Sequence, residues 1–305
     1  MSEPRYRGIV PPLITPLAGP DALDREGFGR LIDRLIDGGV SGLFILGTSG
    51  EGPSLSHRLQ REVVTAGVEL AAGRVPVLVG VTDTSCEECV ALSKHAADAG
   101  ADSVVIAPPY YFPAGQTELT QYVERLVPRM PLPVVLYNMP SLTKVDFEIE
   151  TVCRLMDFDN VVGMKDSGGD LGYYRDLCEV RKKVRPDWSV LIGPESKLRE
   201  SLALGGDGGV HGGANLFPRL FVRLYEACVA GDAAAADRLE AEAAKLHAIY
   251  DIGKYASRHI KAMKSGASVL GICPDTMAEP FNAFLPPERD RVAAVLDTLD
   301  REVAE

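Results

Sequence analysis

The sequence predicts a (β/α)₈ barrel, or TIM barrel, followed by a helical extension at the C-terminal end. Short apolar runs recur along the chain, and amphipathic stretches separate them. Several runs are apolar without polar alternation, as in Val77-Leu78-Val79-Gly80-Val81. Such runs are typical of parallel strands that are covered on both faces. Eight strands that are each followed by a helix favour closure into a barrel.

The expected strands are apolar runs that are bounded by glycine, proline or polar residues. The last of them is mostly glycine and therefore carries the least apolar signal. The runs cover residues 8–16, 42–47, 75–82, 103–109, 133–140, 161–167, 188–195 and 208–214.

The expected helices show apolar residues at helical spacing. From Phe28 onward, apolar residues recur at i+3, i+4, i+7 and i+8, which places them on one helical face. Gly38-Gly39 then ends this helix. The next expected helices cover residues 56–72, 86–99, 118–127, 147–155, 173–184, 196–204 and 218–230.

The alternation stops after Gly231. Helical patterns at 233–250, 254–265 and 288–303 follow, and no Pro/Gly/Ser linker precedes them. We therefore expect a barrel over residues 1–231 and a helical extension over 232–305 that packs on it. An open doubly wound sheet is the rival fold, but it needs a Gly-x-Gly-x-x-Gly turn. Gly47-Thr48-Ser49-Gly50-Glu51-Gly52 spaces its glycines differently.

Composition and charge exclude several classes of protein. The chain of 305 residues has a formal net charge of −11 and no basic run. Nucleic acids and anionic membranes are therefore not expected as partners. No stretch reaches the ~18 apolar residues of a membrane-spanning helix. The N-terminus lacks the apolar segment of a signal peptide, so we expect a cytoplasmic location.

A metal site is not expected. Cys86 and Cys89 have a suggestive spacing, but no second pair and no His-x-x-x-His accompanies them. Reduced thiols in a cytosolic helix are the simpler interpretation.

Lys165 is the first candidate for catalysis. The active site of a barrel lies at the C-terminal ends of its strands, and Lys165 lies near the end of the sixth apolar run. If it faces inward, beside small Gly163, desolvation favours its neutral amine, which can attack a carbonyl. The alternative is a lysine that extends out of the strand end into solvent.

Two further segments follow neighbouring strands. Tyr137 lies near the end of the fifth run, where its hydroxyl could shuttle the proton that imine formation requires. The alternative is a tyrosine that packs in the core. Residues 47–51, Gly-Thr-Ser-Gly-Glu, follow the second run and offer backbone N–H groups and two hydroxyls to a carboxylate or phosphate. An ordinary glycine-rich turn is the alternative there.

Together these segments resemble the dihydrodipicolinate synthase/N-acetylneuraminate lyase family of class I aldolases. Their order and spacing match, and the resemblance covers the whole chain. It implies a barrel that is usually a homotetramer, a dimer of dimers, and a mechanism without metal or organic cofactor. A lysine would form a Schiff base with pyruvate or another 2-oxo acid. The matching motifs are Gly47-Thr48-Ser49-Gly50-Glu51, Tyr137-Asn138-Met139-Pro140 and Gly163-Met164-Lys165-Asp166-Ser167, with Pro109-Tyr110-Tyr111 and residues 205–215 in addition.

The resemblance implies a role for each matching residue. Lys165 would form the Schiff base and Tyr137 would transfer protons. Thr48 and Ser49 would hold the 2-oxo acid carboxylate, with Thr48 also in the proton relay. Tyr111 would cross into the neighbouring subunit's site and complete that relay. The carbonyl near Val210 matches a further position of the pocket.

Departures from the family pattern bear on the substrate. The synthases continue the tyrosine motif with Ser-Arg, whereas this chain has Ser141-Leu142, and leucine cannot pair with a carboxylate. Lys144, two residues further on, is the nearby candidate for a replacement cation, provided that it points toward the pocket. The sialic-acid lyases have Gly-Tyr-Asp-Glu at the seventh strand, where this chain has Gly193-Pro194-Glu195-Ser196.

Two more residues are substrate-binding candidates beside Glu195. Ser167 matches a threonine that stands beside the lysine in the lyases. His211 lies in the glycine-rich eighth run, where it either lines the pocket or is structural.

We therefore interpret the sequence as a class I aldolase or lyase that acts on a 2-keto-3-deoxy sugar acid or a similar compound. Dihydrodipicolinate synthase and a Schiff-base dehydratase of the same family are enzymatic alternatives. A regulatory barrel that binds a 2-oxo acid without turnover is the alternative from a different class. It has no need of an imine-forming lysine.

Overall fold

The computed structural model describes residues 3–304 of the chain, so the outermost residues of the two predicted domains, 1–2 and 305, lie outside it. The chain divides into two compact units. Unit 1 comprises Met1–Gly8 and Val77–Val210, and unit 2 comprises Ile9–Pro76 and His211–Glu305. The predicted boundary at residue 231 stays a prediction.

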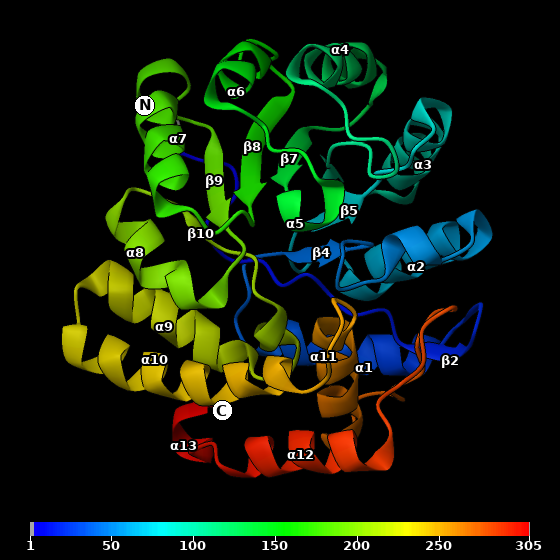
Figure 1. The fold of residues 1–305 in the computed structure, drawn as a ribbon, viewed down its shortest axis with the longest axis vertical. Helices are drawn as coiled ribbons and strands as arrows, with labels where there is room; N and C mark the ends of the chain where they lie inside the picture. Colours follow the sequence, from blue (N-terminus) through cyan, green and yellow to red (C-terminus); the bar gives the residue numbers. More distant parts are fainter. Residues whose placement is uncertain (1–2, 305) are drawn as a thin grey trace. The chain divides into compact units, whose positions relative to one another are not determined.

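Unit 1 contains a parallel sheet whose strand order follows the chain (Figure 1). Each strand pairs with the next one along the sequence, as in successive β-α-β units. Its strands are β5 (Val77–Gly80), β6 (Ser103–Ile106), β7 (Val134–Asn138), β8 (Val161–Asp166), β9 (Ser189–Ile192) and β10 (Gly208–Gly209).

Helices connect these strands, and consecutive helices contact one another along the unit. Local chemistry sets where several of them begin. Ser85 caps the helix after β5 by accepting from the Glu88 amide, and Asp170 caps the helix after β8. The helices are α3 (Cys86–Ala99), α4 (Gln116–Leu126), η2 (Val127–Arg129), α5 (Pro140–Thr143), α6 (Ile149–Leu155), α7 (Leu171–Val184), η3 (Glu195–Lys197) and α8 (Leu198–Ala203).

Unit 2 begins with the N-terminal segments. In its first part, Pro12 forms an isolated parallel β-bridge with Phe44, which lies in the strand Leu43–Ile45. Asp24 and Ser56 cap the two helices that follow. A hairpin of β2 and β3 was not predicted, because its two short strands carry little apolar signal. The elements are β2 (Leu17–Gly19), β3 (Ala22–Leu23), α1 (Arg25–Asp37), β4 (Leu43–Ile45), η1 (Gly52–Ser54) and α2 (His57–Ala71). Strand β1 (Gly8–Ile9) spans the sequence boundary of the units.

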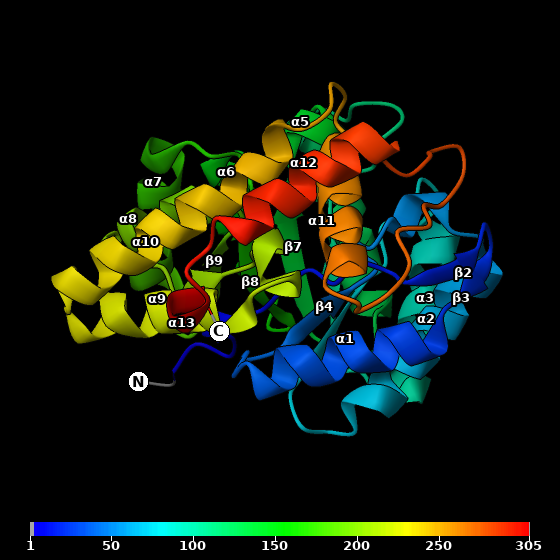
Figure 2. The same cartoon turned by 90° about the horizontal axis from the view of Figure 1, so that it is seen from below.

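The second part of unit 2 is helical. Helices α9 and α10 contact each other, and α12 contacts both α10 and α11; Figure 2 shows α12 running beside α10 and crossing α11. The elements are η4 (Gly212–Asn215), α9 (Pro218–Ala230), α10 (Ala233–His247), η5 (Ala248–Asp251), α11 (Arg258–Val269), α12 (Pro286–Asp297) and α13 (Arg301–Ala304).

Each of the eight predicted runs contains a strand of the structure, and α3 and α9 have the predicted bounds. The prediction of one helix over 288–303 is wrong, because the chain breaks between α12 and α13. At the break the Asp300 amide donates to Glu242 Oε2 at 3.0 Å, and Asp300 Oδ1 accepts from the Glu302 amide at 3.1 Å. Asp300 therefore begins a new helix instead of continuing the old one.

Candidate active site

Lys165 and Tyr137 lie side by side on neighbouring strands. The two residues are direct partners in the register of β7 and β8. Partner residues of adjacent strands point to the same face of a sheet. The Lys165 amine lies 4.0 Å from the centre of the Tyr137 ring, and the residues are only 5% and 6% exposed. The structure therefore brings together the predicted nucleophile and the predicted proton carrier at the C-terminal ends of their strands.

The next residues along the same strands form a second pair on the opposite face. Asn138 and Asp166 are partners in register, and Asn138 Nδ2 donates to Asp166 Oδ1 at 2.8 Å. Asn138 Oδ1 accepts from the Phe147 amide at 3.1 Å, and its Nδ2 also lies 3.3 Å from Asp146 Oδ1. We did not predict this pair. Its signal was a polar residue directly after each candidate catalytic residue in an apolar run.

Asp166 is an unusual carboxyl group for this position. Its side chain is fully buried, and burial raises its pKa above the ordinary value. The hydrogen bonds from Asn138 and from the Gly168 amide, at 3.1 Å, act in the opposite direction. Asp166 Oδ2 is buried without a hydrogen-bond partner among residues 3–304. The hydrogen bond from Asn138 is therefore the largest contribution that stabilises the ionised form of Asp166.

Ser167 and Glu195 follow the ends of β8 and β9, and both are half-buried. The Gly193 amide donates to the Asp166 carbonyl at 2.7 Å, which joins the two strand ends. A Cβ at position 193 would clash with Ser167 Oγ and lie 2.9 Å from Ser167 Cβ. Only glycine therefore lets the Ser167 side chain take this position.

The remaining predicted residues of unit 1 occupy different environments. Val210 is buried just after β10, and its amide donates to the Ile192 carbonyl at 2.8 Å. Tyr111 is 76% exposed, with its ring edge-on to Phe112 at 4.9 Å between centroids. The structure thus places Tyr111 on the surface of the single chain.

In unit 2, Thr48 and Ser49 lie half-buried in the loop Gly47–Gly52 that follows β4. The loop is tightly wound, because the Glu51 amide donates to the Thr48 carbonyl at 3.1 Å and the Gly50 amide to the Gly47 carbonyl at 3.1 Å. Thr15 Oγ1 donates to the Gly50 carbonyl at 2.7 Å. The hydroxyls of Thr48 and Ser49 therefore belong to a loop whose backbone is fixed by several hydrogen bonds.

His211 is also in unit 2 and is fully buried. Its ring lies 5.5 Å from the Phe221 ring of α9. His211 thus packs against a helix of its own unit, and its predicted substrate contact stays a prediction.

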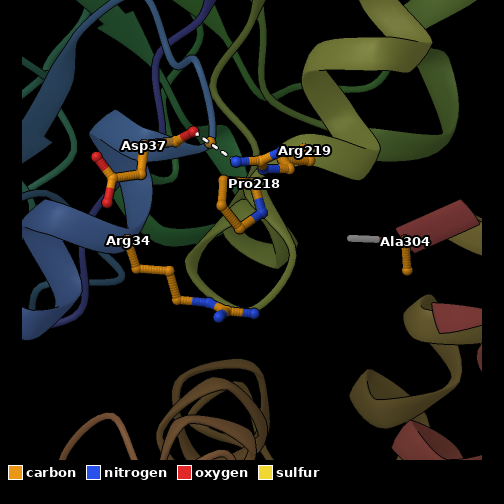
Figure 3. A pocket seen from close by; sticks show the side chains of 6 residues that line it. Arg34, Asp37, Pro218, Arg219 and Ala304 are labelled. Carbon is orange, nitrogen blue, oxygen red and sulfur yellow. Dashed lines mark hydrogen bonds between the residues drawn. The ribbon is translucent and has the colours of Figure 1, made fainter. Parts of the chain in front are cut away.

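A pocket of about 380 Å³ in unit 2 has no part in the predicted site (Figure 3). Its arginines are held by backbone carbonyls: Arg34 donates to Leu216 at 2.7 Å, and Arg219 donates to Asp37 at 3.2 Å. None of the predicted site residues lines it. The lining residues are Arg34, Asp37, Gly38, Pro218, Arg219 and Ala304.

Residues 3–304 contain neither a metal-binding cluster nor a membrane-spanning helix. No three His, Cys, Asp or Glu side chains gather in a way that could hold a metal ion. None of the described helices combines the length and the apolar character needed to cross a bilayer. The prediction of a cofactor-free mechanism stays a prediction.

Solved structures resemble this chain over almost its whole length. Dihydrodipicolinate synthase from Bacteroides thetaiotaomicron matches with a TM-score of 0.94 and 46% identity, over 97% of this chain and 100% of the other. YagE of Escherichia coli K12, solved in complex with pyruvate, matches with a TM-score of 0.91 and 31% identity, over 96% and 98% of the two chains. These likenesses confirm the predicted (β/α)₈ fold class with C-terminal helices, and they define the chain as a barrel enzyme of the aldolase type.

The family model described as "Dihydrodipicolinate synthetase family" matches residues 5–299. A probable 2-dehydro-3-deoxy-D-pentonate aldolase of E. coli K12, YjhH, is 38% identical over 81% of this chain and 82% of its own length. The 4-hydroxy-tetrahydrodipicolinate synthase of Salinibacter ruber is 38% identical over 78% of each chain. The chain belongs to the dihydrodipicolinate synthetase family, as its motifs indicate, and is a lyase that makes or cleaves carbon–carbon bonds.

Proposed function

We propose that the chain is a class I aldolase in which Lys165 forms a Schiff base with pyruvate or a related 2-oxo acid. The single observation that carries this proposal is the buried pairing of the Lys165 amine with Tyr137, 4.0 Å from the ring centre. A buried amine beside a hydroxyl-bearing ring has the two groups that imine formation needs, a nucleophile and a proton carrier.

The proposed reaction proceeds through an imine and an enamine. The neutral Lys165 amine attacks the ketone carbon, and the carbonyl oxygen leaves as water after protons have passed through Tyr137. In cleavage, the C4 hydroxyl gives up its proton through Tyr137 and becomes the aldehyde, while the bond between C3 and C4, one position away from the imine carbon C2, breaks. The electron pair of that bond forms the enamine between C2 and C3. Protonation of the enamine and hydrolysis of the imine then free pyruvate and the amine. Thr48 and Ser49 are the proposed ligands of the 2-oxo acid carboxylate.

We propose a 2-keto-3-deoxy sugar acid, or a similar hydroxylated acid, as the compound cleaved. Leu142 stands where a synthase would carry an arginine, and the Lys144 amine is engaged by a backbone carbonyl. The Lys144 amine donates to the Ser141 carbonyl at 2.6 Å, so it turns back onto its own short helix. The half-buried Ser167 and Glu195 offer polar groups that suit hydroxyls. YjhH and YagE, by their names, act on such acids.

Dihydrodipicolinate synthesis is the second candidate. The observation in its favour is the 46% identity to the Bacteroides synthase over nearly the whole chain. Under this alternative the semialdehyde carboxylate needs a cation, and Lys144 would have to release Ser141 to supply it.

The test of the reaction is reductive trapping. Incubation with pyruvate and borohydride should add one pyruvate-derived mass per chain, on the peptide that contains Lys165, while Lys165→Ala takes up none and keeps its fold. Label on a different lysine would refute the mechanism. A panel of 2-keto-3-deoxy sugar acids, assayed for pyruvate release, tests the substrate beside aspartate semialdehyde plus pyruvate. Efficient condensation that Lys144→Ala abolishes would establish the second candidate.

We further propose a cytoplasmic homotetramer in which Tyr111 reaches a neighbouring subunit. Tyr111 and Phe112 form an exposed aromatic pair, 76% and 79% exposed, of the kind that subunit contacts cover. Sedimentation of the wild type and of Phe112→Ser tests this: a tetramer that the substitution weakens is expected, and a monomeric wild type would refute it.

A further inference from the structure

A buried ion pair inside unit 2 joins the loop Gly47–Gly52 to the C-terminal helices. Lys264 lies on α11, and its amine pairs with Glu51 Oε1. The two side chains are 0% and 1% exposed. Neither residue takes part in the proposed reaction.

Each partner has a further contact with the segment between α11 and α12. The Lys264 amine donates to the Thr276 carbonyl at 2.6 Å, and Glu51 Oε2 accepts from the Ala278 amide at 2.9 Å. Glu51 is thus bound through both of its oxygens to residues that lie far away in the sequence. The loop Gly47–Gly52 cannot shift without breaking these contacts.

Glu51 is well placed to transmit this restraint to the hydroxyl residues. Its backbone has a φ of 56°, in the left-handed region that side chains other than glycine rarely adopt. Its amide bonds to the Thr48 carbonyl at 3.1 Å, which closes the turn around Ser49. At Gly52, a Cβ would clash with the Leu46 carbonyl, so the loop has little room to rearrange.

Stability alone is a weak reason for this pair. Burial lowers the pKa of Lys264, and the charge of Glu51 opposes that effect. A buried ion pair commonly contributes no more stability than a packed apolar pair, because both charges lose their hydration. Hydrogen bonds are directional and apolar contacts are not. The ion pair can therefore fix the loop in one geometry through defined donors and acceptors, and an apolar pair cannot.

We propose that Lys264 is a positioning residue for the 2-oxo acid carboxylate, acting through Glu51 on Thr48 and Ser49. The inference rests on the proposed function, in which these two residues hold that carboxylate. The C-terminal helices thereby fix the geometry of the loop Gly47–Gly52.

The test measures how the rate of borohydride trapping depends on the pyruvate concentration. Lys264→Met has a similar length and no charge. We expect it to raise the half-saturating pyruvate concentration about tenfold or more, equivalent to about 1.4 kcal/mol of binding. Label should still appear on Lys165. A half-saturating concentration within about twofold of the wild type would overturn the proposal.

A second variant covers the case in which Lys264→Met does not fold, because that substitution leaves Glu51 charged and buried. Glu51→Ala combined with Lys264→Met leaves neither charge. It should therefore fold, but it lacks the contacts that hold the loop Gly47–Gly52 to the C-terminal segment. The same rise of about tenfold is expected, and wild-type half-saturation in this folded variant would overturn the proposal.

Arg181→Met is the matched control. Arg181 pairs with Asp207 at 3.6 Å in unit 1, and the side chains are 9% and 7% exposed. We expect this loss of a buried ion pair to lower stability without changing half-saturation by pyruvate. If wild-type protein is not trapped on Lys165 at all, the proposed function fails. That outcome differs from a failure of the positioning proposal, in which the wild type is trapped and the variants have the same half-saturating pyruvate concentration.

Discussion

Replacing Asn138 by alanine should destabilise the fold, because Asn138 joins the end of β7 to the end of β8, directly after Tyr137 and Lys165. The substitution removes the donor to Asp166 at 2.8 Å and the acceptor of the Phe147 amide at 3.1 Å. It leaves a buried carboxylate whose Oδ2 already has no hydrogen-bond partner among residues 3–304. Water cannot easily replace the lost contacts, because Asn138 and Asp166 are 1% and 0% exposed.

The magnitude follows from the groups that are left behind. A hydrogen bond to a charged partner contributes about 1.5–3 kcal/mol, and a buried donor without an acceptor costs about 1–3 kcal/mol. Asp146 is exposed and its contact is long, so it adds little. We expect Asn138→Ala to lower the free energy of unfolding by about 3–5 kcal/mol at neutral pH.

The loss should shrink in acid. Asp166 has a raised pKa in the folded state, so the folded protein binds its proton more tightly than the unfolded chain, and stability falls as pH rises through that pKa. Asn138 lowers the pKa of Asp166, so its removal raises this pKa further and extends the destabilisation at neutral pH. At about pH 4 more of the carboxyl group is protonated in the variant, and the difference from the wild type becomes smaller.

Urea unfolding at both pH values, followed by fluorescence of Trp188, measures the difference. Asn160→Ala is the control, because Asn160 makes one neutral hydrogen bond in the same unit, to the Val127 carbonyl at 3.0 Å. It should cost about 1 kcal/mol at either pH. A loss below about 1 kcal/mol for Asn138→Ala, or an equal loss at both pH values, would refute the reasoning.

Three further predictions concern catalysis and specificity. Tyr137→Phe should slow trapping by pyruvate about 10²–10⁴-fold, because a positioned proton carrier is lost, and near wild-type rates in stopped-flow trapping would contradict its role. Gly193→Ala should lower stability by about 1–3 kcal/mol and impair cleavage, because its Cβ meets Ser167; Gly29→Ala, whose nearest neighbour is 3.6 Å away, should be tolerated in the same thermal melts. Leu142→Arg should increase condensation of aspartate semialdehyde relative to sugar-acid cleavage in steady-state assays, and an unchanged ratio would mean that position 142 does not select the substrate.

The fold was predictable because its signal is repeated along the chain. Each apolar run contains a strand, and serine and glycine mark the ends of α3 as their capping chemistry requires. The strand ends were overestimated, as in the first run, which was predicted over 8–16 but is a strand only over Gly8–Ile9. Apolar residues continue past the last ladder pair, and the sequence pattern does not show where pairing stops.

The candidate site was predictable only where its residues follow the strand pattern. Lys165 and Tyr137 lie near the ends of neighbouring apolar runs, which predicted that they lie close together but left the direction of each side chain open. The register of β7 and β8 makes them direct partners. The Glu51–Lys264 pair could not be found in this way, because its partners are far apart in the sequence and lie in a loop and a helix. A lysine in an amphipathic helix is normally a solvated residue, and only the packed structure shows that Lys264 is buried.

This difference between residues on strands and residues in the segments that follow them explains why the reaction class is easier to infer than the substrate. Lys165 and Tyr137 are partners in the ladder of β7 and β8, so their backbones cannot move apart without breaking hydrogen bonds of the ladder. Leu142 and Glu195 lie instead in α5 and η3, short helices that follow strands and can change sequence without disturbing the sheet. Relatives named as a sugar-acid aldolase and as a synthase of 4-hydroxy-tetrahydrodipicolinate both match this chain at 38% identity, so one fold accommodates both kinds of substrate. Because the side chain at 142 does not support the ladder, exchanging it should alter the choice of substrate far more than the ability of Lys165 to form an imine.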